Sequence, residues 1–143
     1  MFYLNKKEFD YAIRICAYLA GMKNGSPISV NIISKKLLIS KPFATKIIFN
    51  LRGHKIIGSK QGKFGGVYLT VNPQKLTLFD ILKSVGFNQT ISGCINEAGF
   101  CPLPSPCKLH SYFIKTENKL LSDLKSKKIS SFSFTDSDLN IKK

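Results

Sequence analysis

The sequence predicts a mainly α-helical fold with one small β-hairpin. Two short amphipathic segments joined by a tight turn precede two β-type segments that flank a glycine-rich stretch, all within residues 29–71. The same half of the chain is strongly basic. Residues 1–75 hold 13 of the 22 Lys and Arg and two of the eight Asp and Glu, a net charge of +11. On a 143-residue chain this surplus favours a polyanionic partner, with nucleic acid the first candidate.

Two amphipathic helices are expected at the start of the chain. Apolar side chains recur at helical spacing over residues 6–20, beginning with Phe9. Cys16 lies on this apolar face, and we interpret it as a small core residue. Ser29 is a good N-cap, so a second helix is expected over about 30–38.

A third helix is expected over about 41–52, with Ser40 as its N-cap and Pro42 in its first turn. The helical period predicts that its buried side chains are Phe43, Ile47, Ile48 and Leu51. Its other faces carry polar and basic side chains: Lys41, Thr45, Lys46, Asn50 and Arg52. Two short helices joined by a tight turn, the second exposing polar and basic groups, form the helix-turn-helix pattern.

A β-hairpin is predicted directly after the third helix. One strand begins at Ile56 and the other covers 67–71, where apolar and polar side chains alternate. Between them lie three glycines and two lysines: Gly62, Gly65, Gly66, Lys60 and Lys63. A hairpin with a flexible basic tip in this position is typical of the wing of a winged helix. A phosphate-binding loop is a weaker interpretation, because the Gly-Lys-Ser/Thr order of a P-loop is absent and a strand follows.

The chain is expected to divide near residue 75. Residues 1–75 are predicted to form a winged helix-turn-helix DNA-binding domain. Residues 76–143 are predicted to hold a short helix over 77–85, a sensor loop over about 88–107, a long helix over about 108–128, and a polar, partly ordered tail. The long helix carries an apolar stripe at Leu120, Leu121 and Leu124 with little in its own chain to pack against. We therefore expect it to pair with the same helix of a second copy in a homodimer, although packing within the chain stays open.

Three of the four cysteines cluster as Cys94-x6-Cys101-x5-Cys107. These gaps are wider than the two to four residues typical of a structural zinc knuckle, so iron–sulfur is favoured over zinc. A disulfide without any metal is the alternative for an oxidised sample. A fourth ligand is needed: His110 follows Cys107 by one helical turn, and Asp10 is its rival if a second subunit brings it near.

Other classes of protein find little support. No apolar run approaches the roughly 18 residues that span a membrane, and the N-terminus lacks the apolar core of a secretory signal. A cytoplasmic protein is expected. With two histidines, few carboxylates and no hydrolase motif, an enzyme is not favoured. A Cys107–His110 nucleophile pair is the remaining enzymatic alternative.

The order of these features resembles the Rrf-type iron–sulfur winged-helix regulators, the IscR, NsrR and RirA-like group of bacterial transcription factors. The segments that carry the resemblance are FDYAIRICAYLA, ISKPFATKIIFNLR, GKFGGVYL, LTLFDILKSVG and CKLH, spread over residues 3–128. The resemblance implies a homodimeric repressor or activator of transcription that binds double-stranded DNA according to the state of its cluster.

The resemblance also assigns residues to the sensor. Cys94, Cys101 and Cys107 match the family's cluster cysteines. The Cys107-x2-His110 ending matches members that hold a 2Fe–2S cluster through three Cys and one His. Asp10 falls where nitric-oxide-sensing members place an aspartate on a 4Fe–4S cluster.

In the DNA-binding half, Pro42, Thr45 and Lys46 match the positions that face bases. Lys41, Lys46, Arg52, Lys60 and Lys63 are expected to bind phosphates.

Three positions depart from the family. Gln61 stands where the wing often has Arg, Lys55 stands where Gly is usual, and the first cysteine gap is six where many members have five. The alternative to a cluster regulator is a thiol-redox or zinc-stabilised winged-helix regulator.

Overall fold

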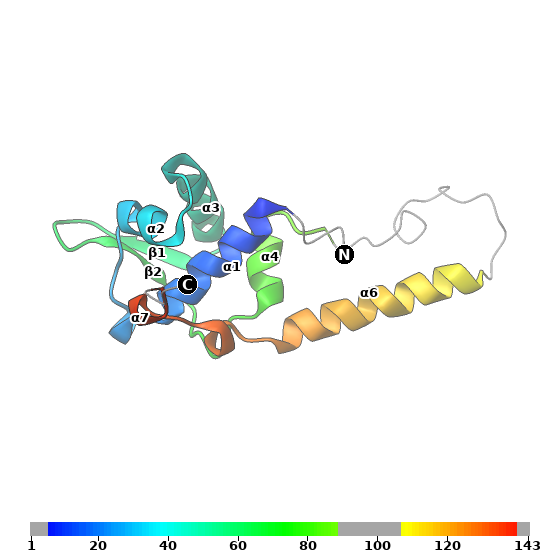
Figure 1. Ribbon diagram of the computed structural model, residues 1–143. Coiled ribbons are helices and arrows are strands. Elements are labelled where there is room, and N and C mark those ends of the chain that lie inside the picture. The colour runs from blue at the N-terminus through cyan, green and yellow to red at the C-terminus, as the bar shows by residue number, and fades with distance from the viewer. Residues whose placement is uncertain (1–5, 89–106, 140–143) are drawn as a thin grey trace.

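The computed structural model describes residues 6–88 and 107–139 (Figure 1). In chain order its elements are α1 (Lys7–Ala20), η2 (Lys23–Gly25), α2 (Val30–Leu37), α3 (Lys41–Gly53), β1 (Ile57–Lys60), β2 (Gly66–Leu69), α4 (Leu78–Ser84), α6 (Lys108–Ser126), η3 (Ile129–Phe132) and α7 (Asp136–Leu139). The predicted fold class, mainly α with one antiparallel hairpin, is confirmed.

Helix α1 runs through the middle of the molecule, with α2 and α3 on one side, α4 beside it and α7 near its C-terminal end (Figure 1). Ile15 and Cys16 have no solvent exposure. Burial among apolar side chains raises the pKa of the Cys16 thiol, so it stays protonated. The interpretation of Cys16 as a core residue is confirmed.

The helix-turn-helix is fixed by hydrogen bonds at its turn. The Ser29 hydroxyl accepts the Ile32 N–H at 3.2 Å, which confirms the predicted cap of α2. At the other end of α2, Ser34 accepts the Ile39 N–H at 3.1 Å and donates its hydroxyl to the Ile39 carbonyl at 2.6 Å. Ser40 precedes α3 as expected but makes no side-chain cap bond.

The wing is shorter than predicted. Its strands pair antiparallel from Ile57 with Leu69 to Lys60 with Gly66. The wing is tied to the chain before α2, because Ile28 and Val67 exchange both backbone hydrogen bonds, at 2.8 and 2.9 Å. Gly66 is required at this contact, since its φ is +153° and a Cβ there would overlap the Ile28 backbone.

The C-terminal end of α6 packs within its own chain, which corrects one expectation. Leu124 is buried in a cluster with Phe9, Phe79, Leu82 and Phe87, and Leu120 and Leu121 lie against that cluster. Figure 1 shows the helix leaving the body from this end. The stripe expected to form a dimer interface therefore packs on α4 and the start of α1, because α4 carries apolar side chains of its own on this side, Phe79 and Leu82.

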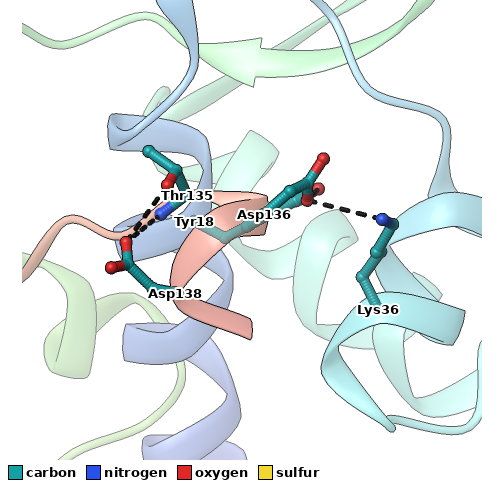
Figure 2. A network of polar contacts seen from close by, with 5 residues as sticks. All are labelled: Tyr18, Lys36, Thr135, Asp136 and Asp138. Carbon is teal, nitrogen blue, oxygen red and sulfur yellow. Dashed lines mark hydrogen bonds and ion pairs between the residues drawn. The ribbon is translucent and has the colours of Figure 1, made fainter. Parts of the chain in front are cut away.

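The tail after α6, expected to be polar and partly ordered, packs against the N-terminal half through η3 and α7. Ile129 is fully buried and its N–H donates to the Leu76 carbonyl at 2.8 Å. Further on, the Tyr18 hydroxyl donates to the Asp136 carboxylate at 2.7 Å, and Lys36 of α2 lies 3.6 Å from the same carboxylate (Figure 2). Burial and Asp136 together raise the pKa of Tyr18 to about 12.

Lys55 adopts a left-handed backbone, with φ of 59°, at the turn between α3 and β1. A side chain in this conformation costs roughly 1–2 kcal/mol, which glycine avoids at an entropic cost of about 0.5–1 kcal/mol. We predict that Lys55→Gly leaves stability equal or raises it by up to about 1 kcal/mol, measured as the midpoint of urea unfolding. Lys35→Gly, in the regular exposed part of α2, is the matched control and should destabilise by about 0.5–1 kcal/mol. Equal destabilisation by both changes would contradict the account.

Candidate nucleic-acid interface and cysteine segment

Helix α3 exposes all five of the side chains predicted to contact DNA from this helix: Lys41, Pro42, Thr45, Lys46 and Arg52. The buried face, with Ala44, Ile47 and Leu51, anchors α3 against the core, so the exposed face is held outward. The Thr45 hydroxyl donates to the Lys41 carbonyl at 2.8 Å. That bond leaves the oxygen lone pairs and the methyl group of Thr45 for an outside partner.

The wing carries the other predicted contacts. Lys60 ends β1, Gln61 and Lys63 lie in the tip, and all three are exposed. The Lys63 ammonium lies 5.7 Å from the centre of the Phe64 ring. Within the described part of the chain, none of the candidate phosphate-binding cations of α3 and the wing forms an ion pair. Their charge is therefore uncompensated on this face and suits a polyanion.

A hollow of about 290 Å³ separates α3 from the wing. Its lining includes Thr45, Phe49 and Arg52 from α3 and Lys60 from β1. Phe49 was not predicted from the sequence as a DNA contact. Its helical spacing from Pro42 and Thr45 would have indicated the same face of α3. The structure thus brings one basic group of the helix, Arg52, and one of the wing, Lys60, to the edge of one partly apolar depression.

The cysteine segment is described only at its end. Cys107 is a half-buried free thiol immediately before α6, and the half-buried His110 follows on the first turn. Side chains three residues apart at the start of a helix lie on the same side, so the thiol of Cys107 and the imidazole of His110 can bind the same ligand. Cys94 and Cys101 lie outside the described residues. Within the ranges 6–88 and 107–139, no group of three Cys, His, Asp or Glu side chains comes together as a metal site.

Asp10 is not beside Cys107 in the same chain. Its carboxylate pairs with Arg14 at 2.6 Å and is largely exposed. The neighbouring Phe9 ring lies 5.7 Å from Phe87, next to the point where the chain enters the cysteine segment. Cys107 precedes the packed Leu124 by 17 positions, about 26 Å along the helix axis. Thus Asp10 lies near the start of the cysteine segment, and His110 lies at its far end.

Residues 5–133 match the Rrf2 family, described as an iron-dependent transcriptional regulator. The chain belongs to the Rrf2 family of transcriptional regulators. It is 31% identical over 115 residues to Protein aau3 of Rhizobium meliloti, covering 78% of this chain and 73% of that protein. It is 28% identical over 101 residues to the HTH-type transcriptional regulator NsrR of Shouchella clausii, covering 70% and 68%. The family and its NsrR relative are regulators of transcription, not enzymes.

Solved structures of the family share the fold. T. potens IscR superposes with a TM-score of 0.70 at 19% identity, covering 87% of this chain and 82% of that one. CymR, the global cysteine regulator of B. subtilis, superposes with a TM-score of 0.72 at 18% identity, covering 90% and 97%. The winged-helix architecture of this Rrf2 member is therefore confirmed. Across the described ranges, no helix is both long and apolar enough to cross a membrane.

The exposed lysines of the wing lead to a quantitative prediction about how DNA affinity depends on salt. Each phosphate contact releases counterions and adds about −0.9 to the slope of log affinity against log salt. We predict that Lys60→Ala/Lys63→Ala makes this slope shallower by up to about 1.8 and weakens all duplex sequences similarly, as measured by fluorescence anisotropy from low to high salt.

Lys75→Ala/Lys127→Ala provides the matched control for that experiment. Both lysines are exposed, lie outside α3, the wing and the first half of α6, and their loss changes the net charge of the chain equally. The control should leave the slope unchanged. Identical slopes for the wing variant and the unmodified chain would exclude the wing from the phosphate contacts.

Proposed function

We propose that this Rrf2 member is a bacterial homodimeric regulator whose DNA affinity is set by an iron–sulfur cluster. The observation that carries the proposal is the pair formed by Cys107 and His110. The free thiol of Cys107 immediately precedes α6 and the imidazole of His110 follows on the first turn, directly after the segment that holds Cys94 and Cys101. Thiolate and imidazole are ligands that iron–sulfur clusters use.

The available ligand side chains fit an iron–sulfur cluster better than a structural zinc ion. Cys94, Cys101 and Cys107 would supply thiolates, and either His110 or the partner copy's Asp10 would complete the set. Such a cluster supplies redox and ligand-exchange chemistry. The single non-thiolate position is the weakest bond to iron, so an oxidant, nitric oxide or a proton is expected to act there first.

The chain links the cysteine segment to the DNA-binding face through packed elements. α6 begins at the cysteines and ends on α4, and the chain then continues into η3 and α7. η3 packs on α1, while Asp136 of α7 binds Tyr18 of α1 and Lys36 of α2 (Figure 2). A shift of α6 that follows loss of the cluster would therefore be transmitted to the elements that hold α3.

The homodimer is part of the same proposal. Its interface is now the first half of α6 and not the predicted stripe of Leu120, Leu121 and Leu124. The first half of α6 leaves Leu109 64% and Tyr112 61% exposed, and the rings of Tyr112 and Phe113 lie 5.7 Å apart. The second copy's α6, laid against this apolar face, would cover these side chains. In that arrangement Cys107, two residues before Leu109, would lie near the partner subunit, which is what a contribution from the partner subunit's Asp10 requires.

The dimer makes a prediction of its own. Leu109→Asp/Tyr112→Asp should lower the mass measured by analytical ultracentrifugation at micromolar concentration to that of a monomer, because charges would be buried in the interface. Leu139→Asp, another exposed apolar position far from α6, is the control and should leave the dimer intact. A monomeric unmodified chain would contradict the dimer.

The cluster is tested by the visible spectrum of anaerobically reconstituted protein. Cys94→Ala, Cys101→Ala and Cys107→Ala should each abolish the iron–sulfur absorbance, since every thiolate is a required ligand. Cys16→Ala should leave it unchanged, because that thiol is buried in the core and protonated. Of His110→Ala and Asp10→Ala, only the change at the true fourth ligand should alter the spectrum.

Two outcomes would favour the alternative of a thiol-based or zinc-stabilised regulator. Tight binding of one zinc ion with no uptake of iron and sulfide would exclude the cluster. Reversible disulfide formation without any metal would point to direct thiol sensing. In both cases the DNA-binding face of α3 and the wing would be unaffected.

A further inference from the structure

Phe49 stands at the centre of the exposed face of α3, with 72% of its side chain open to solvent. Successive helical residues are separated by about 100°, so Phe49 projects roughly 20° from Pro42, 40° from Thr45 and 160° from the buried Leu51. It thus points directly away from the core. Nothing in the packing of the described residues requires a large aromatic group there.

The surroundings of Phe49 define what would cover it. The ring borders the hollow between α3 and the wing, beside Thr45, Arg52 and Lys60. The partner must therefore bring an apolar group to the ring and negative charge to the cations around it. The major groove of duplex DNA offers both, because phosphates line its edges and each thymine presents a C5-methyl group inside it.

We propose that Phe49 is a specificity-determining residue that reads thymine, with its ring against the C5-methyl group in the major groove. The inference rests on the proposed DNA-binding function and names the base that this face selects. A phenyl ring has no hydrogen-bonding group, so it distinguishes thymine from cytosine only through the methyl. Thr45 and Lys46 would supply polar contacts to neighbouring bases.

The test replaces thymine by deoxyuridine, which differs only by lacking the methyl. Duplexes that the full-length chain binds are first selected from a random pool, and each thymine is then replaced singly. We expect one thymine per half-site at which the unmodified chain loses about fourfold in affinity, the effect of burying one methyl group. Phe49→Ala should bind the thymine and uracil duplexes equally, and Phe49→Leu should keep part of the difference.

Two control variants make the assignment specific to Phe49. Phe64→Ala removes another exposed phenylalanine, at the wing tip, and should keep the full methyl effect at the same position. Thr45→Ser removes the other candidate methyl contact on this face and should also keep it. Phe49→Ala should unfold at the same temperature as the unmodified chain, since its side chain is mostly exposed.

Three results would overturn the inference alone. These are a selected duplex indifferent to every thymine methyl, a methyl effect that survives in full in both Phe49→Ala and Thr45→Ser, or a methyl effect that disappears in Thr45→Ser but persists in Phe49→Ala, which would assign the methyl contact to Thr45. A chain that selects no duplex from the pool would overturn the proposed function, and this inference with it.

Discussion

The structure depends on the burial of α1. Ile15 and Cys16 are fully enclosed, and α2, α3, α4, β2 and η3 all pack on this helix. α3 and the wing, which carry the candidate DNA-binding face, are therefore held by the same helix as α4, on which the C-terminal end of α6 packs. A protein interior is close-packed, so this support moves as a unit and does not absorb small displacements. That property suits the proposed regulator, in which the cysteine segment and the DNA-binding face lie on different elements.

The helices and the wing could be predicted because their signals are local. The Ser29 cap, the Thr77 capping box and the glycines of the wing fix where elements begin and turn. Helical periodicity found three of the buried side chains of α3, Ile47, Ile48 and Leu51, whereas Phe43 is only partly buried and Ala44 was not predicted. The usual glycine of the family at the position of Lys55 is explained by the left-handed backbone found there.

What the sequence could not provide was the identity of distant partners. Periodicity marks Leu124 as apolar but does not say whether α4 or a second subunit covers it. The polar composition of the tail does not indicate where the tail packs, and the partner of Asp136 is Tyr18, which lies 118 positions away. The exposure of Phe49 was available from the helical period of α3. A phenylalanine next to Ile47 and Ile48 is easily assigned to the core instead.

The central claim is that cluster occupancy sets DNA affinity, and one comparison tests it most directly. The affinity of the same full-length chain for a selected duplex would be measured anaerobically before and after removal of the cluster, at fixed salt. Coupling between two sites of a regulator is typically worth 5- to 150-fold in affinity. The account predicts a change in that range, and Cys107→Ala should bind with the affinity of the cluster-free chain. Equal affinities with and without the cluster would contradict it.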